Sequence, residues 1–193
     1  MKAIDLKLRS GHFTVICGTE PAAKDIKQSF LTYTENDTWY AACDPESGIL
    51  YNSKITLPAF VPESVTLAAA DASVAAAPIC SGTISVDLRN SSAELELRAR
   101  RIICRLGRGN ATIKAAPSIA AVFECGNGSM DIFLPRSPRG YRYSIVRGAG
   151  SVIINSIPAG RNAAYGPEGG IPVNIKCGLG TVNIMEYQSG TGT

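Results

Sequence analysis

The feature that most constrains the fold is a Gly-X-Gly template that occurs four times in the second half of the chain. Each copy has an extended segment, a Gly-X-Gly triplet, a small polar residue, and then apolar residues two positions apart. The copies are CRLGRGNATIKA, FECGNGSMDIFL, SIVRGAGSVIIN and NIKCGLGTVNIM. A spacing of two is the period of a β-strand, so the apolar residues of each copy face one side of a strand. The template predicts a repetitive β architecture.

The glycines are predicted to turn the chain rather than to hold a phosphate. A tight corner calls for positive φ angles, which glycine adopts without a steric penalty. A dinucleotide-binding loop would need a third glycine and a following helix, and a P-loop would need Gly-Lys-Ser/Thr. None of the copies has these features. The predicted turn residues are Gly107, Gly109, Gly126, Gly128, Gly148, Gly150, Gly178 and Gly180.

Successive copies align at their apolar positions. The first glycines of successive pairs lie 19, 22 and 30 residues apart, which fits one coil of a repetitive β architecture for each copy, with an insertion in the longest interval. The chain begins with a degenerate fifth copy, in which Ser10 and Gly11 precede Phe13 and Val15. The first inward position holds Ala111, Met130, Val152 or Val182, and the second holds Ile113, Ile132, Ile154 or Ile184.

Between about residue 63 and the first triplet the chain reads as short strands, of which AELELRA has the clearest alternation. The segment LAAADASVAAAP favours a helix on propensity alone. It shows no helical stripe and is interrupted by Pro78, so a strand is predicted there too. Residues 135–142 and 158–172 are expected to be loops.

We predict one all-β domain over residues 1–193. Residues 1–60 are expected to form irregular N-terminal strands that cap the repeats, residues 61–187 to form the repeats, and residues 188–193 to be a flexible tail. Aromatic side chains are concentrated in the predicted cap, where they would cover an end of the stacked core. They are Tyr33, Trp39, Tyr40 and Tyr51.

The sequence resembles the bacterial putative-adhesin domains of unknown function, the DUF4097-like family. The resemblance rests on the four glycine pairs with their isoleucines and on strands that end in Leu-Pro, namely ITLP at 55–58 and FLP at 133–135. It covers residues 50–187 well and the N-terminal part weakly. The resemblance implies a β-solenoid with rungs about 4.8 Å apart, and it brings no catalytic residues to this chain.

The cysteines and the single histidine give no sign of a metal site. No two of the six cysteines have CxxC spacing, and most lie among apolar neighbours, so buried reduced thiols are expected. We expect no metal and no cofactor. The sequence contains no apolar run of about 18 residues and no signal peptide, so membrane insertion is not expected. If the chain is full length, it is expected to be cytoplasmic; alternatively it is the soluble part of a cell-surface protein.

Charge is distributed unevenly along the chain. The net charge is −5 over residues 1–97 and +8 over residues 98–147. On a solenoid, residues one coil apart lie on the same face, so this basic block can form a strip that contacts a protein or a polyanion, although a solvated face also explains it. The residues of this candidate strip are Arg98, Arg100, Arg101, Arg105, Arg108, Arg136, Arg139, Arg142 and Arg147.

The predicted function is a non-enzymatic structural or interaction module that binds a protein or polysaccharide or associates with itself. The unequal charges of the two halves would favour head-to-tail stacking. Nucleic acid is not expected, because aromatic residues other than Tyr141 and Tyr143 are not interleaved with the arginines. The alternative is a β-helix that binds or degrades carbohydrate, which would use carboxylates such as Glu124 and Asp131 on either side of one turn. No SxxK, GxSxG or HExxH motif is present.

Overall fold

A computed structural model describes residues 1–19, 21–24, 30–43, 51–58 and 60–188. Tail residues 189–193 and the side chain of Tyr51 lie outside the described part. Within it the chain is all-β, and no described segment forms a helix that could cross a membrane. The strands are β1 (Ala3–Arg9), β2 (Gly11–Gly18), β3 (Ala22–Lys24), β4 (Phe30–Glu35), β5 (Thr38–Cys43), β6 (Tyr51–Pro58), β7 (Ser64–Ala70), β8 (Ser73–Arg89), β9 (Ser91–Leu106), β10 (Gly109–Cys125), β11 (Ser129–Pro135), β12 (Tyr141–Arg147), β13 (Ser151–Ile154), β14 (Ile157–Pro158), β15 (Asn162–Tyr165), β16 (Ile171–Cys177) and β17 (Thr181–Tyr187).

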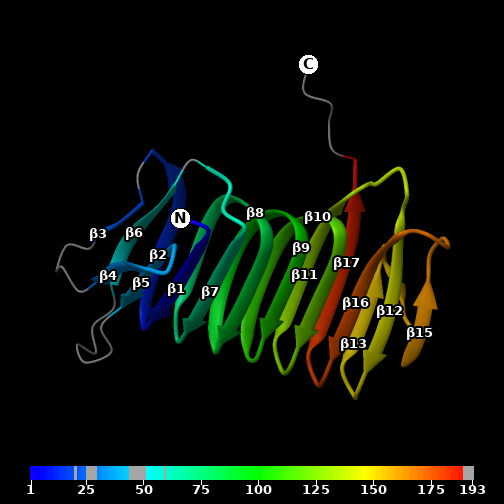
Figure 1. The fold of residues 1–193 in the computed structure, drawn as a ribbon. Helices are drawn as coiled ribbons and strands as arrows, with labels where there is room; N and C mark the ends of the chain where they lie inside the picture. The colour runs from blue at the N-terminus through cyan, green and yellow to red at the C-terminus, as the bar shows by residue number, and fades with distance from the viewer. Residues whose placement is uncertain (20, 25–29, 44–50, 59, 189–193) are drawn as a thin grey trace.

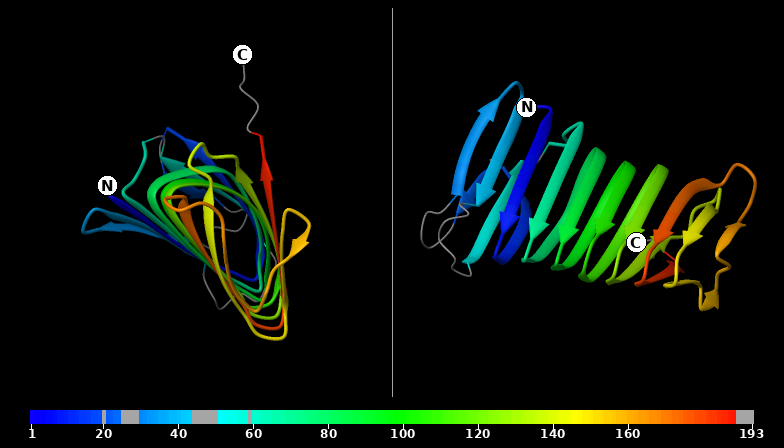
Figure 2. Two further views of the ribbon diagram at one scale, coloured as in Figure 1. Left: turned by 90° about the vertical axis from the view of Figure 1, so that its right-hand side faces the viewer. Right: turned by 90° about the horizontal axis from the view of Figure 1, so that it is seen from below.

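The middle of the molecule is a stack of parallel strands in which each strand pairs with the next one along the chain. The strands β8, β9, β10 and β11 are in register. Equivalent residues lie opposite one another in successive strands, in the order Ser73, Ser92, Asn110 and Ser129. Figure 1 shows these layers side by side, and the view along the stack in Figure 2 shows that they surround one common interior. The predicted strand over the alanine-rich segment is confirmed, since it lies in β7 and β8.

Both ends of the chain are inserted between layers formed by other segments. β1 pairs in parallel with β5 on one side and β7 on the other, and β2 lies between β6 and β8. At the other end, β16 lies between β10 and β12, and β17 lies between β11 and β13. In Figure 1 the red β17 accordingly stands between β11 and β13. Residues 3–18 are therefore part of the parallel stack, although the sequence suggests an irregular cap there.

Antiparallel strands cover the two ends of the stack. β4 pairs with β5 and β3 with β6 at one end, and β15 pairs with β12 and β14 with β13 at the other. Short antiparallel strands of this kind reduce the length of unpaired parallel edge, which would otherwise recruit other chains. β15 lies within residues 158–172, so the prediction of a loop over that whole segment is wrong. The antiparallel pairing was not visible in the apolar pattern, because the residues of β15 are mostly exposed.

The interior consists of rows of apolar side chains that run along the stack. One row follows the second half of each layer and contains Leu6, Leu67, Val86, Cys104, Phe123, Ile175 and Ile145. The four template isoleucines form another row, in the order Ile113, Ile132, Ile184, Ile154. All of these residues except the partly buried Ile154 are buried. Burying a side chain of this size stabilises the fold by about 1.5–3 kcal/mol.

The glycine triplets stack on one another at one corner of the layers. Their order along the stack is Gly107, Gly126, Gly178, Gly148, so the last two copies do not follow the order of the chain. The backbone N–H of Gly126 donates to Leu106 at 2.7 Å, that of Gly178 to Cys125 at 2.8 Å, and that of Gly148 to Cys177 at 2.7 Å. The last copy is the inserted one, because β16 and β17 follow β12 and β13 in the chain but lie between them and β10 and β11.

Close stacking, rather than positive φ, explains most of these glycines. Of the eight predicted turn residues only Gly109 has a positive φ, of 104°. A Cβ atom on Gly126 would lie 2.8 Å from the carbonyl oxygen of Gly107, and one on Gly148 would lie 2.9 Å from that of Gly178. Left-handed corners occur earlier in the stack, at Asp71 and Asn90, with φ of 52° and 51°, which aspartate and asparagine tolerate better than most residues.

Alanine substitutions at equivalent corners should separate these two explanations. Gly126→Ala should lower the free energy of unfolding by about 1–3 kcal/mol, because the methyl group would overlap a backbone oxygen of the neighbouring layer. Gly107→Ala is the matched control, since the nearest atom to its Cβ would be 3.7 Å away. Denaturant unfolding monitored by circular dichroism measures both. Equal losses of stability in the two variants would contradict the stacking explanation.

Candidate interaction surface

The parallel register brings side chains from distant parts of the sequence into rows on the outer face. One such row runs through Lys7, Ala68, Asp87, Arg105, Glu124, Lys176 and Val146. A neighbouring row, nearer the glycine corner, begins with Arg9, Ala70 and Arg89. Neighbouring residues in a row are one strand spacing apart, about 4.8 Å. Charged groups from neighbouring layers of these rows can therefore form ion pairs with one another.

Glu124 forms the centre of an ion-pair ladder in the first row. Arg105 Nε donates to Glu124 Oε2 at 2.8 Å, and Lys176 Nζ donates to Oε1 at 2.9 Å. These hydrogen bonds, from Lys176 and then Arg105, lower the pKa of the Glu124 carboxyl. Arg89 Nη2 approaches Asp87 Oδ2 at 3.5 Å in the adjacent layer. Glu124 thus links β9, β10 and β16, and it helps to hold the inserted strand.

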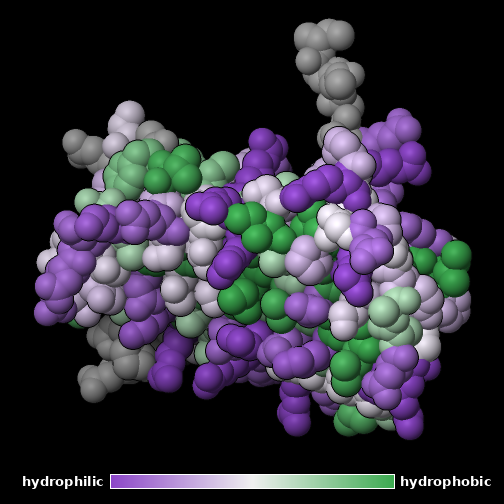
Figure 3. Space-filling view, turned by 45° about the vertical axis from the view of Figure 1, so that its right-hand side comes forward, coloured by the Kyte–Doolittle hydropathy of each residue, from purple (hydrophilic) through white to green (hydrophobic). Residues whose placement is uncertain are grey.

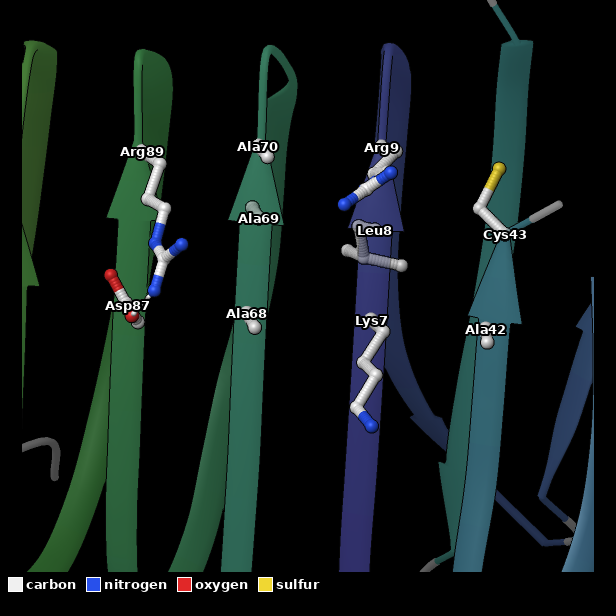
Figure 4. Close-up of a pocket in the computed structure, with 10 residues that line it drawn as sticks. All are labelled: Lys7, Leu8, Arg9, Ala42, Cys43, Ala68, Ala69, Ala70, Asp87 and Arg89. Carbon is white, nitrogen blue, oxygen red and sulfur yellow. Dashed lines mark hydrogen bonds and ion pairs between the residues drawn. The ribbon is translucent and has the colours of Figure 1, made fainter. Parts of the chain in front are cut away.

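A first hollow lies on the outer face of β5, β1, β7 and β8. It has a volume of about 450 Å³. Figure 4 shows the small side chains of Ala68 and Ala70 between Lys7 and Arg9 on one side and Asp87 and Arg89 on the other. The hollow exists because alanines stand where the neighbouring layers carry long side chains.

A second hollow, of about 570 Å³, continues from the first at Asp87 and Arg89, which line both. It is lined by glycines of the four stacked corners and by three charged side chains, namely Gly107, Gly126, Gly178, Gly148, Arg105, Glu124 and Lys176. We call the two hollows together the trough. The strands β5, β1, β7, β8, β9, β10, β16 and β12 follow one another beneath it, which gives a length of about 34 Å at the usual strand spacing.

The structure does not gather the predicted arginines into one strip. Arg98 lies between Cys80 and Ala116 in the neighbouring layers, Arg101 lies between Thr83 and Ala120, and Arg105 lies between Asp87 and Glu124. Arg98 also pairs with Glu96 at 2.7 Å on its own strand. Basic residues in β9 therefore have few basic neighbours along the stack. Figure 3 shows apolar patches interspersed with hydrophilic side chains on the face that it displays.

The other predicted arginines have separate environments. Arg147 donates to the carbonyl oxygens of Ala159 and Gly150, at 3.2 and 2.9 Å, and Arg139 donates to that of Ser118 at 2.7 Å. Those two arginines support the backbone. Arg100, Arg108, Arg136 and Arg142 form no ion pair with another described residue. Of the nine arginines, Arg105 alone lines the trough.

The carboxylates considered for catalysis have different partners. Glu124 belongs to the ion-pair ladder, whereas Asp131 accepts a hydrogen bond from Asn183 Nδ2 at 2.7 Å. His12 is exposed on β2. No cluster of His, Cys, Asp and Glu suited to a metal ion occurs among the described residues.

All six cysteines lie in the described part of the chain, and Cys17, Cys80, Cys104, Cys125 and Cys177 form no disulfide. Cys43, Cys104, Cys125 and Cys177 are buried, Cys80 is partly buried and Cys17 is exposed. Burial raises the pKa of the Cys104 thiol to about 12. The expectation of buried reduced thiols therefore fits most of them but is wrong for Cys17.

Sequence reasoning missed most of the residues of the trough. Lys7 and Lys176 come from the two inserted ends of the chain, and Arg9 and Arg89 lie outside the basic block. Aligning the chain at the spacing of 18 or 19 residues that relates β8, β9 and β10 would have placed Asp87, Arg105 and Glu124 in one row. No comparable signal marks the inserted strands.

Comparisons with known proteins identify the fold. No protein-family model matches the sequence, and a search of curated proteins gave no match. A structure from Clostridium sporogenes described as a putative cell adhesion protein superposes with a TM-score of 0.53 and 17% identity, over 96% of this chain and 92% of that one. Putative adhesins from Bacteroides fragilis and Parabacteroides distasonis give TM-scores of 0.40 and 0.36, with 12% and 9% identity, over the same shares of the chains. At this identity the Clostridium structure shows a shared fold and nothing about ligands.

The ladder around Glu124 makes stability depend on pH. The pKa of the Glu124 carboxyl is lowered in the folded state. The ion pairs of Glu124 therefore stabilise the fold fully above the ordinary carboxyl pKa of the unfolded chain, and this stabilisation is lost as the pH falls through the lowered folded value. Glu124→Gln should reduce the free energy of unfolding by up to about 1 kcal/mol at pH 7. The difference from the unsubstituted protein should shrink towards zero at acid pH.

Urea unfolding at a series of pH values measures this difference. Glu35→Gln is a suitable control, because Glu35 lies on β4, which covers one end of the stack, and forms no ion pair with another described residue. A Glu124→Gln effect that is independent of pH would contradict the assignment.

Proposed function

We propose that the protein is a non-enzymatic interaction module that holds an extended anionic partner along the trough. The observation that carries this proposal is the trough itself, which continues across eight stacked strands and is bordered by aligned charged side chains. A long, shallow and rigid surface of this kind suits a polymer better than a small substrate, which binds in a deeper cavity.

The charges of the trough favour an anionic partner. Asp87 and Glu124 already interact with Arg89, Arg105 and Lys176. Lys7 has only a 3.8 Å contact to Asp5, and Arg9 forms no ion pair with another described residue. Positive charge therefore remains available at the β1 end of the trough. Arg9 and Arg89 stand on either side of Ala70, and their guanidinium groups suit carboxylate or sulfate groups on the partner.

We further propose that the stacked layers are the coils of a β-solenoid and that the chain is a divergent relative of the DUF4097-like adhesin domains. The in-register parallel pairing at a spacing of 18 or 19 residues supports the first point. The Gly-X-Gly corners and the fold shared with the Clostridium structure support the second. A role at a cell surface would fit these proposals.

Calorimetric titration with polygalacturonate, and with dextran as a neutral polymer, tests the proposed function. Polygalacturonate should bind with an affinity that falls as salt is raised, and dextran should give no heat of binding. No reducing ends should be released, which distinguishes binding from degradation. The double substitution Arg9→Gln and Arg89→Gln should weaken binding about tenfold or more, since each charge-assisted hydrogen bond contributes about 1.5–3 kcal/mol.

The matched control is the double substitution Arg136→Gln and Arg142→Gln, which removes the same charge away from the trough. It should leave binding nearly unchanged. Equal weakening in both double variants would show a non-specific charge effect and contradict the proposal. Release of reducing ends would favour the carbohydrate-degrading alternative.

A further inference from the structure

A separate hollow of about 310 Å³ lies at the end of the stack formed by β12 to β15. The antiparallel strands β14 and β15 cover this end only in part, and the hollow lies between them and the last apolar layer. Its volume is near the lower limit for small-molecule sites in proteins, which begin at about 300 Å³. It shares no lining residue with the trough.

Two tyrosines of β12 form its inner wall and are fixed in position. Tyr141 donates its hydroxyl hydrogen to the carbonyl oxygen of Pro135 at 2.6 Å, and Tyr143 donates to Glu186 Oε1 at 2.7 Å. Their ring centroids are 6.2 Å apart. Burial raises the pKa of Tyr141 to about 12 and also raises that of Tyr143, so both hydroxyls remain protonated donors.

The outer wall is aromatic and apolar. Tyr165 on β15 is 45% exposed, and its hydroxyl accepts a hydrogen bond from the N–H of Gly160 at 3.0 Å, which holds the ring at the rim. Ile157 on β14 is 70% exposed. These side chains leave apolar surface in contact with water at the mouth of the hollow, where a ligand would cover it.

Among the described residues that line the hollow, Glu186 supplies the only carboxylate, and none is a lysine or an arginine. Its Oε1 accepts the hydrogen bond from Tyr143, and its backbone N–H donates to Asn155 Oδ1 at 2.9 Å. No described cation pairs with it. An aromatic hollow thus contains a positioned negative charge without a counter-charge.

We propose that this hollow binds a small organic ammonium group, with Glu186 as its counter-ion and the tyrosine rings as its walls. Aromatic faces attract ammonium groups, more strongly when the cation is desolvated. One carboxylate and one amide are too few oxygen ligands for calcium or magnesium. A neutral ligand would leave the charge of Glu186 uncompensated. This site is independent of the proposed function, because the trough is positively charged and is lined by other residues.

Choline is the probe for the test, and 3,3-dimethyl-1-butanol is its neutral counterpart of the same shape. Ligand-observed saturation-transfer NMR, followed by titration of the protein resonances, gives the dissociation constants. Choline should bind saturably in the millimolar range or tighter, and the neutral alcohol at least tenfold more weakly. Glu186→Gln should weaken choline binding about tenfold, while its amide oxygen can still accept the Tyr143 hydrogen bond. Tyr165→Ala should weaken binding of choline severalfold.

Glu35→Gln is the matched control, since it removes one carboxylate at the opposite end of the stack. It should leave choline binding unchanged. Three results would each overturn the proposal: no saturable binding of choline, equal affinity for choline and the neutral alcohol, or equal weakening by Glu186→Gln and Glu35→Gln. Unchanged amide resonances outside the hollow in the Glu186→Gln variant confirm that it is folded.

Discussion

The structure depends on the hydrogen-bonded register between neighbouring parallel strands. Because each layer lies directly on the one before, every side-chain position becomes a row along the stack, and the rows alternate between the interior and the outer face. The register leaves little space at the corners, where Gly126, Gly148 and Gly178 each face a carbonyl oxygen of the adjacent layer. A slip of one residue would turn an apolar row outward, so the buried rows and the glycine corners support the same alignment.

The same register creates the surface on which the proposed function rests. Asp87, Arg105, Glu124 and Lys176 come from four different strands and are widely separated in sequence, yet they form one row. The ion pairs of Glu124 with Arg105 and Lys176 add little stability at an exposed site. They nevertheless fix charged groups at intervals of one strand, beside a trough that small side chains leave open. A partner with regularly spaced charges would bind to side chains that are already held in place, so that little side-chain conformational entropy would be lost on binding.

Much of this architecture could be predicted from the sequence. The period-two pattern after each glycine pair placed Ile113, Ile132, Ile154 and Ile184 in one row, and that row is present. The order of the layers could not be predicted, because the copies are nearly equivalent and any of them can lie on any other. The order is decided by the connections over residues 136–140 and 155–170, whose polar sequences carry no periodic signal. The trough was missed for the same reason, since Lys7 and Lys176 reach it only through the inserted ends.

The most distinctive feature of the strand order is that both ends of the chain are inserted between other layers. Amide hydrogen exchange tests this insertion most directly. β16 over residues 173–177 and β17 over residues 181–184 are paired on both edges, although both lie close to the C-terminus. The amides of these residues should therefore exchange as slowly as those of the central strand β9, and far more slowly than those of β15 at the outer edge. If they instead exchange as fast as those of β15, the layers follow the order of the chain and the inserted arrangement is wrong.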